Sequence, residues 1–173
     1  MNSEYLLFLG LYLLGLLIRA GYEILKKAGR VQPKNKWAFA LVFAAMCLLW
    51  ASWFNLPPLD PFRVTLPDPV RWIGYGVLMV GFGLAIWAFL QLRGLENISR
   101  LVTTGLFSRI RHPMYAGFIL WILGWVMVHG ALFSLVFGAI GIGNILYWRL
   151  LEEKDLETRY GEDYRRYRKG TWF

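Results

Sequence analysis

Two polar stretches of this otherwise apolar chain carry the side chains that could do chemistry. The first runs from Leu101 to Gly117 (LVTTGLFSRIRHPMYAG) and contains Arg111, His112 and Pro113. Because proline is well suited to the first turn of a helix, we expect Arg111 and His112 to lie where a helix leaves an aqueous or interfacial layer. The start of such a helix offers free backbone N–H groups and a positive dipole end, and this predicts a seat for an anion.

The second polar stretch runs from Arg149 to Tyr167 and places two adjacent carboxylates after an arginine. Arg149 precedes Glu152 and Glu153 by three and four residues, so the three side chains lie on neighbouring faces of a helix. Carboxylates at a membrane edge are costly unless they are paired. We therefore expect the two stretches to close on each other and form one site.

The composition predicts that this chain lies in a membrane. Hydrophobic residues make up 57% of the 173 residues, too many for a soluble domain of this size to bury. The single cysteine, Cys47, excludes a disulfide framework, and His112 and His129 stand too far apart in the sequence to indicate a metal site. In so apolar a chain, a net charge of +8 predicts loops that face anionic lipids and not nucleic acid.

The apolar runs predict an all-α integral membrane protein with about five transmembrane helices. The five runs are Tyr5–Ile18, with a possible continuation through Ala20–Leu25, then Trp37–Leu56, Arg71–Leu92, Met114–Val128 and Ala131–Trp148. A signal peptide fits the first run poorly, because no basic residue precedes it and no small-x-small cleavage site follows it. Glycine and proline residues predict loops at Arg19–Lys36 and Asn55–Pro69.

The glycines of the third span and the length of the fourth predict how the helices pack. Small residues let helices approach closely, and the third span contains Gly74, Gly76, Gly81 and Gly83. Met114–Val128 would rise only ~22 Å as a helix, against a membrane core of ~30 Å. We expect the last two spans to form a tilted helical hairpin that turns at His129-Gly130.

These elements predict one membrane domain, residues 1–173, with three N-terminal spans in 1–92 and a catalytic half in 93–173. The loops and tail on one side of five spans hold 17 Lys and Arg residues, and the other side holds only Arg63 and Arg71. This asymmetry predicts an N-terminus outside and a C-terminus in the cytoplasm. Both polar stretches then lie on the cytoplasmic face, as a shared site requires.

The tail is expected to be an amphipathic cytoplasmic helix that runs on from the fifth span. Leu156, Tyr160, Tyr164 and Tyr167 recur at spacings of four, four and three, which predicts one apolar-aromatic face. An anionic lipid surface would suit the basic residues Arg159, Arg165, Arg166, Arg168 and Lys169. A helix that only anchors the tail is the alternative interpretation.

As a pair, LVTTGLFSRIRHPMYAG and EEKDLETRYGEDYRRY resemble the isoprenylcysteine carboxyl methyltransferase family of integral membrane enzymes, over roughly residues 75–170. Arg-His-Pro-x-Tyr alone also occurs in related membrane phospholipid methyltransferases. The resemblance implies S-adenosylmethionine as the cofactor, a pocket at the cytoplasmic membrane edge, and a lipophilic small-molecule, lipid or prenylated substrate. It implies cofactor contacts at Leu101, Val102, Phe107, His112, Pro113, Met114, Tyr115 and Glu152.

The chain departs from this family's pattern in three places. Phe107 stands where the family usually has tyrosine, so a hydroxyl contact is missing. The connection from Arg93 to Arg100 is shorter than usual and lacks an Asn-Trp-Ser-like segment. The tail ends in Thr171-Trp172-Phe173 and not in a proline-containing close.

Methyl transfer from a sulfonium is an in-line displacement, so the protein mainly aligns the nucleophile and excludes water. A carboxylate nucleophile is already ionised at neutral pH and needs only a cation to place it. We expect Arg149 to bind that carboxylate bidentately, with Arg111 in reserve. A phospholipid amine would instead need a base, for which Glu153 is the candidate. A non-catalytic membrane scaffold also stays open, and would have no reason to bind S-adenosylmethionine.

Overall fold

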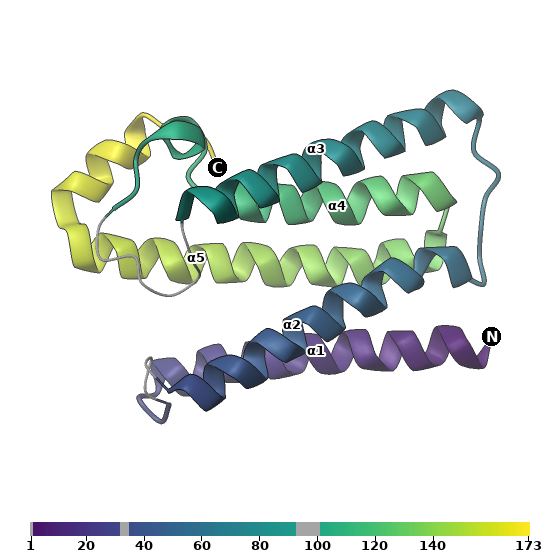
Figure 1. The fold of residues 1–173 in the computed structure, drawn as a ribbon, viewed down its shortest axis with the longest axis horizontal. Helices are drawn as coiled ribbons and strands as arrows, with labels where there is room; N and C mark the ends of the chain where they lie inside the picture. The colour runs from purple at the N-terminus through teal and green to yellow at the C-terminus, as the bar shows by residue number, and fades with distance from the viewer. Residues whose placement is uncertain (1, 32–34, 93–100) are drawn as a thin grey trace. The chain divides into compact units, whose positions relative to one another are not determined.

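The computed structural model describes residues 2–31, 35–92 and 101–173, and their secondary structure is helical apart from two isolated bridges (Figure 1). The predicted all-α fold is confirmed. The elements are α1 (Ser3–Lys27), α2 (Lys36–Asn55), η1 (Pro57–Leu59), α3 (Asp68–Leu92), η2 (Gly105–Ser108), α4 (Pro113–His129) and α5 (Leu132–Lys169), where η marks a 3₁₀ helix. The Arg93–Arg100 connection lies outside the described residues.

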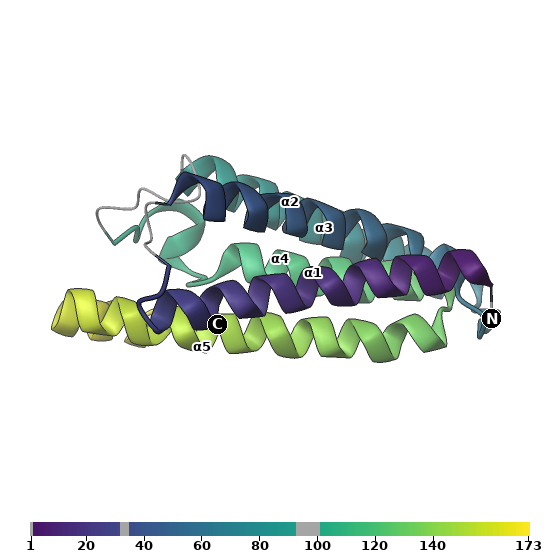
Figure 2. The ribbon, with the colours of Figure 1, turned by 90° about the horizontal axis from the view of Figure 1, so that it is seen from below.

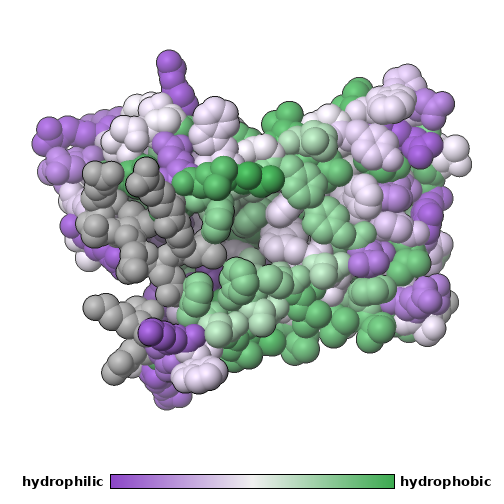
Figure 3. All heavy atoms as spheres, viewed as in Figure 1, coloured by the Kyte–Doolittle hydropathy of each residue, from purple (hydrophilic) through white to green (hydrophobic). Residues whose placement is uncertain are grey.

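Four helical segments of the described chain are long and apolar enough to cross a membrane: α1, Lys36–Leu59, α3 and α5. The apolar helix α4 is shorter, at 17 residues. Large apolar side chains on these helices are widely exposed, including Leu17 at 70%, Trp72 at 72% and Leu90 at 66%. Figure 3 shows hydrophobic residues across the middle of one face. Exposed apolar surface on this scale identifies an integral membrane protein.

Two helix boundaries differ from the sequence prediction. The loop predicted to begin at Arg19 is helical as far as Lys27, because Arg19 pairs with Glu23 one turn further on and no proline intervenes. The helix ends just before Gly29, which has a φ of 70°. The helix α3 begins at Asp68, since Pro69 fits the first turn of a helix.

The chain forms two compact units. The first contains Met1–Leu66 and His129–Asn144, and the second contains Pro67–Val128 and Ile145–Phe173. The third helix therefore belongs to the same unit as α4, and not to the unit that holds α1 and α2.

In the first unit, α1 packs closely against α2 and against the beginning of α5. A Cβ at Gly15 would lie 2.8 Å from the Leu49 Cβ, so the two backbones meet at this glycine. The buried Tyr5 hydroxyl lies 3.3 Å from the Ser134 Oγ of α5. The Tyr12 hydroxyl donates to the Phe137 carbonyl at 3.4 Å.

The turn predicted at His129-Gly130 is present, because α4 ends at His129 and α5 begins at Leu132. Gly130 has a φ of 59°, and its carbonyl accepts a hydrogen bond from the Val64 N–H at 2.9 Å. The buried carboxylate of Asp60 accepts the Ser134 N–H in the first turn of α5. Asp60 therefore caps α5 from a distant part of the sequence.

In the second unit, α3 and α4 pack together through glycines. Figure 1 shows the two helices side by side. A Cβ on Gly81 would lie 2.8 Å from the Gly117 carbonyl oxygen, and a Cβ on Gly124 would lie 2.6 Å from the Leu78 nitrogen. Gly74 also faces α4, whereas a Cβ on Gly76 or Gly83 would meet nothing within 4 Å. The predicted close approach is thus confirmed for two of the four glycines of α3. These are Gly74 and Gly81.

The helix α5 bends sharply at Gly161, where φ is 52° and ψ is −123°. Residues that carry a Cβ rarely adopt this backbone conformation. The predicted single aromatic face is therefore interrupted: Tyr160 precedes the bend, and Tyr164 lies beyond it with no exposed surface. Figure 1 shows the yellow end of α5 turning away from the long straight part, and Figure 2 shows the straight part from below.

Candidate functional site

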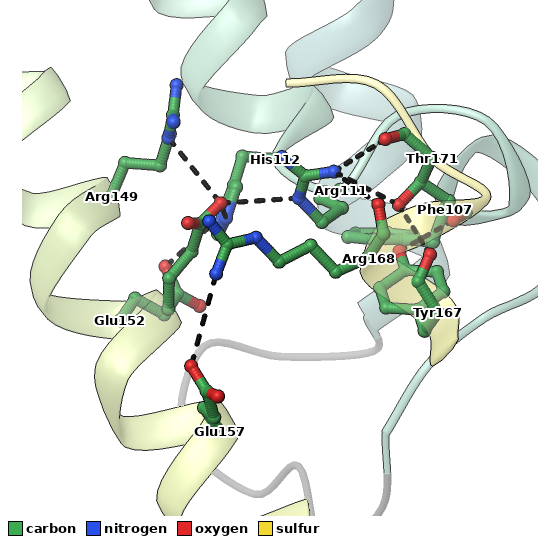
Figure 4. A network of polar contacts seen from close by, with 10 residues as sticks. Phe107, Arg111, His112, Arg149, Glu152, Glu157, Tyr167, Arg168 and Thr171 are labelled. Carbon is green, nitrogen blue, oxygen red and sulfur yellow. Dashed lines mark hydrogen bonds and ion pairs between the residues drawn. The ribbon is translucent and has the colours of Figure 1, made fainter. Parts of the chain in front are cut away.

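The candidate site is organised around one buried carboxylate, that of Glu153 on α5. Its side chain is 7% exposed, and its Oε1 lies 3.2 Å from Arg111 Nε, 3.4 Å from His112 Nε2 and 3.6 Å from Arg149 Nε. Figure 4 shows the arginines and His112 converging from two segments. The two polar stretches therefore meet within the second unit, as the sequence predicted.

Arg111 is held by protein groups on several sides. Besides its contact with Glu153, its Nη1 donates to the Arg168 carbonyl at 3.1 Å. The same nitrogen donates to the Thr171 carbonyl at 2.5 Å and lies 3.3 Å from the Thr171 Oγ1. The guanidinium thus joins the start of α4 to α5 and to the end of the chain.

The last residues run beside the segment that precedes α4. The Arg111 N–H donates to the Trp172 carbonyl at 3.0 Å, and the Trp172 N–H donates to the Arg109 carbonyl at 2.8 Å. The His112 N–H donates to the Phe173 backbone oxygen at 3.2 Å. The His112 N–H, one of the backbone donors predicted to bind an anion, is therefore already hydrogen-bonded within the protein.

Arg149 is held differently from Arg111. Its guanidinium carbon lies 4.8 Å from the centre of the Phe173 ring, and its side chain is 22% exposed. Within the described residues, its terminal nitrogens make no hydrogen bond or ion pair, and Figure 4 shows them extending away from Arg111. This guanidinium can therefore bind an anionic group without breaking an existing contact.

His112 is a neutral imidazole at pH 7. Its pKa is lowered from 6.5 to about 4, chiefly because burial disfavours the charged ring. The positive charges of Arg149 and Arg111 lower the pKa further, whereas Glu153 opposes this shift. The ring stacks on Tyr115 with centres 5.6 Å apart.

The two adjacent glutamates occupy different environments. Glu153 is buried among the arginines, whereas the Glu152 side chain is 45% exposed and its Oε2 lies 3.7 Å from His112 Nδ1. Because Glu152 is partly open to solvent beside a neutral ring, it can accept hydrogen bonds from a ligand. Glu153 serves as the buried counter-ion of Arg111 and Arg149.

The apolar residues implied by the resemblance lie on both sides of η2. Leu101 and Val102 are half-buried in the irregular segment before η2, and Phe107 is buried within it. The Phe107 carbonyl accepts the Tyr167 hydroxyl at 2.6 Å, so this position meets a tyrosine from the tail. Pro113 and Met114 form the first turn of α4, with Pro113 buried.

Sequence reasoning missed one residue that positions the Thr-Thr-Gly turn. Gln91, near the end of α3, donates to the Thr104 carbonyl at 2.5 Å and accepts the Leu106 N–H at 3.1 Å. Between them, Gly105 has a φ of 61°. The sequence signal for Gln91 was its polar amide side chain at the end of an otherwise apolar span.

The tail contributes the other residues that sequence reasoning did not assign to the site: Tyr164, Tyr167, Arg168, Thr171 and Phe173. Within the described chain, the buried Tyr164 hydroxyl has no hydrogen-bond partner. The sequence placed Tyr164, Tyr167 and Arg168 on an amphipathic tail but did not give them contacts in the site, because the bend at Gly161 is what brings them back. Across the described ranges no three potential ligands gather as a metal site needs.

Comparison with known proteins places the chain in a family. A family model described as NnrU protein matches residues 3–172, so the chain belongs to the NnrU protein family. Over 70 residues it is 36% identical to a protein-S-isoprenylcysteine O-methyltransferase of Schizosaccharomyces pombe, covering 40% of this chain and 30% of the relative. This similarity confirms the resemblance drawn from the two polar stretches.

Two further curated proteins are similar to the chain. A methanethiol S-methyltransferase of Pseudomonas deceptionensis is 33% identical over 109 residues, covering 57% of this chain and 40% of the relative. The steroid 5-alpha-reductase DET2 of Solanum lycopersicum is 30% identical over 112 residues, covering 61% of this chain and 44% of the relative. The chain thus spans less than half the length of each of these three relatives.

Proposed function

We propose that this member of the NnrU protein family is an integral membrane methyltransferase that uses S-adenosylmethionine to methylate an anionic, lipophilic nucleophile, most directly a carboxylate. One observation carries the proposal. Arg149 presents uncommitted guanidinium nitrogens beside a buried cluster in which Glu153 already neutralises part of the positive charge. The similarity to two proteins named as methyltransferases supports the same reaction class.

The residues beside His112 fit the cofactor chemically. S-adenosylmethionine, when bound, supplies an electrophilic methyl group, and it carries an adenine and a zwitterionic amino-acid end. Glu152 would accept hydrogen bonds from the ammonium or the ribose hydroxyls, while the stacked rings of His112 and Tyr115 offer an apolar wall. We assign the rest of the wall to Leu101, Val102, Phe107, Pro113 and Met114.

Arg149 and Arg111 have separate roles in this proposal. Arg149 would bind the carboxylate of the substrate in a bidentate manner and align it with the methyl group. Arg111 already uses its Nε on Glu153 and its Nη1 on carbonyls of the tail, so we assign it to holding the site together. The role of Glu153 is then to fix both guanidinium groups.

An amine nucleophile fits this site less well than an anion. A protonated amine would need a base at neutral pH. Glu153 is enclosed by two arginines, and His112 has a pKa of about 4, so neither is matched to that task. A phospholipid amine is therefore the weaker alternative.

A hydride-transfer reaction, raised by the similarity to a steroid reductase, is less consistent with the charges. Dinucleotide hydride donors carry a pyrophosphate, which proteins bind with helix N-termini and surplus positive charge. Here the charges of Arg111 and Arg149 are balanced by Glu152 and Glu153, and the His112 N–H is already used. A balanced site suits the zwitterionic end of S-adenosylmethionine.

We place this site in one membrane domain of five spans, with α4 as the short fourth span. The N-terminus would lie outside and the C-terminus in the cytoplasm, because 17 of 19 Lys and Arg residues fall on the site's side. The final part of α5 would lie along the membrane surface as an amphipathic helix. A lipophilic or prenylated substrate would then reach Arg149 from the bilayer, among membrane lipids.

The reaction is tested directly with membranes that contain the expressed protein and methyl-labelled S-adenosylmethionine. We expect label in the lipid extract that mild alkaline hydrolysis releases as volatile methanol, because a methyl ester is cleaved whereas an N-methyl group stays on its non-volatile amine. Stable label in a phospholipid would establish the amine alternative. Absence of both label and cofactor binding would leave the non-catalytic scaffold.

The division of roles predicts distinct effects on cofactor binding. Glu152→Gln should weaken S-adenosylhomocysteine binding by about tenfold or more, since a hydrogen bond to a charged group contributes ~1.5–3 kcal/mol. His112→Ala should act likewise, whereas Arg149→Ala should keep the affinity and lose ~10²-fold or more in turnover. Titration calorimetry on purified protein measures the affinity.

The matched control for this experiment is Glu162→Gln, which makes the same change on an exposed carboxylate of the same helix. Glu162 pairs with Arg165 at the surface, where ion pairs contribute little. Parent-like binding by both Glu152→Gln and His112→Ala would refute the pocket. Loss of binding in Arg149→Ala alone would reverse the assigned roles.

A further inference from the structure

We propose that Phe173 is a positioning residue that holds the guanidinium of Arg149 in the orientation needed to receive the substrate. This inference rests on the proposed role of Arg149. The guanidinium carbon lies 4.8 Å from the centre of the Phe173 ring, within the range of a cation–π contact. Among the described residues, this group also lies near Glu153, with Nε 3.6 Å from the carboxylate oxygen, longer than a normal hydrogen bond.

The two arginines of the site show why a ring is used for this purpose. Arg111 is fixed by N–H donors to Glu153, the Arg168 carbonyl and Thr171, and these contacts occupy its Nε and Nη1. A substrate-binding guanidinium must be held while its terminal N–H groups stay free. An aromatic ring does this, because it contacts the face of the guanidinium and leaves the edge available.

Phe173 is itself located by the segment that precedes α4. Its backbone oxygen accepts the His112 N–H at 3.2 Å, and the neighbouring Trp172 exchanges hydrogen bonds with Arg109 and Arg111. Trp172 is 68% exposed, whereas Phe173 is half-buried over Arg149. The backbone that carries the ring is therefore held against the segment that precedes α4.

Two substitutions separate the cation–π contact from simple packing. Phe173→Tyr keeps an aromatic face, whereas Phe173→Leu keeps apolar bulk and removes it. Phe173→Met serves as a second non-aromatic variant should the leucine variant fold poorly. Lys169→Ala, on the same tail and exposed, is the matched control.

The first readout needs no substrate. The side chains that face His112 include Arg111, Arg149, Glu152 and Glu153, and the charge of Arg149 lowers the His112 pKa. With ¹³C-labelled histidine in detergent, Phe173→Leu should therefore shift the titration of His112 upward. Phe173→Tyr and Lys169→Ala should titrate like the parent protein. The signal of His129 provides the folding reference.

The second readout uses N-acetyl-S-farnesylcysteine, which carries a carboxylate, and its uncharged carboxamide as probes. Phe173→Leu should weaken carboxylate binding by about 2- to 30-fold, the range of a cation–π contact, and leave amide and S-adenosylhomocysteine binding unchanged. Failure of the parent to bind S-adenosylhomocysteine or the carboxylate probe would refute the proposed function, while the histidine titration still tests the contact. A parent-like His112 titration in Phe173→Leu and Phe173→Met would overturn the role of Phe173.

Discussion

At the scale of single residues, the site shows how burial gives neighbouring groups different properties. Glu152 and Glu153 are adjacent in sequence, yet the side chain of Glu153 is 7% exposed and that of Glu152 is 45% exposed. The buried carboxylate is surrounded by Arg111, Arg149 and His112, so it stabilises the cluster. The exposed one is the carboxylate that we assign to the cofactor.

The neutral state of His112 makes a prediction about stability and pH. Its pKa is about 4 in the folded protein, below the ordinary value of 6.5, so the unfolded chain binds a proton first as the pH falls. Stability is therefore full above pH 6.5 and declines as the pH falls towards 4. Between pH 7 and pH 5 we expect a loss of about 2 kcal/mol from this group.

Thermal unfolding of the detergent-solubilised protein at pH 7, 6 and 5 measures this loss. The comparison is His112→Asn, which has no group that titrates in this range and should show a smaller decline. Equal declines in the parent and in His112→Asn would show that His112 is not the group responsible.

At the scale of elements, the bend in α5 decides which residues reach the site. The straight part of the helix carries Arg149 and Glu153, and the part beyond Gly161 carries Tyr167 back to the Phe107 carbonyl. The arginines of the tail on both sides of Gly161 pair with acidic residues of α5, as Arg159 does with Asp155. The tail thus has less free positive charge for anionic lipids than its sequence indicated.

Gly161→Ala isolates the contribution of the bend. A Cβ at Gly161 would meet nothing within 4 Å, so the substitution acts through the backbone angles alone. We expect a loss of ~1–3 kcal/mol and faster hydrogen exchange at the Arg111 and Trp172 amides. Hydrogen exchange followed by mass spectrometry provides the measurement.

The control for this experiment is Gly143→Ala in the same helix. A Cβ at Gly143 also meets nothing within 4 Å, but its backbone is helical, so alanine should be neutral or slightly stabilising. Unchanged amide exchange in Gly161→Ala would show that the tail does not depend on the glycine conformation.

At the scale of the whole molecule, the asymmetry of basic residues predicts how the chain lies in the membrane. All the Lys and Arg residues apart from Arg63 and Arg71 fall on one side of the five proposed spans. A reporter that is active only in the cytoplasm, fused after Phe173, should therefore be active. A reporter that is active only outside should be silent at this position, and its activity there would reverse the orientation.

The sequence by itself determined the helices and the identity of the main polar residues. Helix formation depends on contacts three and four residues apart, so apolar runs and a proline at position 113 were enough to predict five helices and the turn before α5. The paired polar stretches likewise indicated which residues would converge, because an apolar environment requires buried charges to find partners.

Only the tertiary structure decided which of these residues are buried, which are exposed, and which partners each one contacts. Which glutamate is buried, which arginine keeps free nitrogens, and how Phe173 meets Arg149 all depend on the bend at Gly161 and on contacts between distant segments. Such contacts have no local period in the sequence. They are fixed by packing and by the need to satisfy buried polar groups, and both are properties of the folded chain.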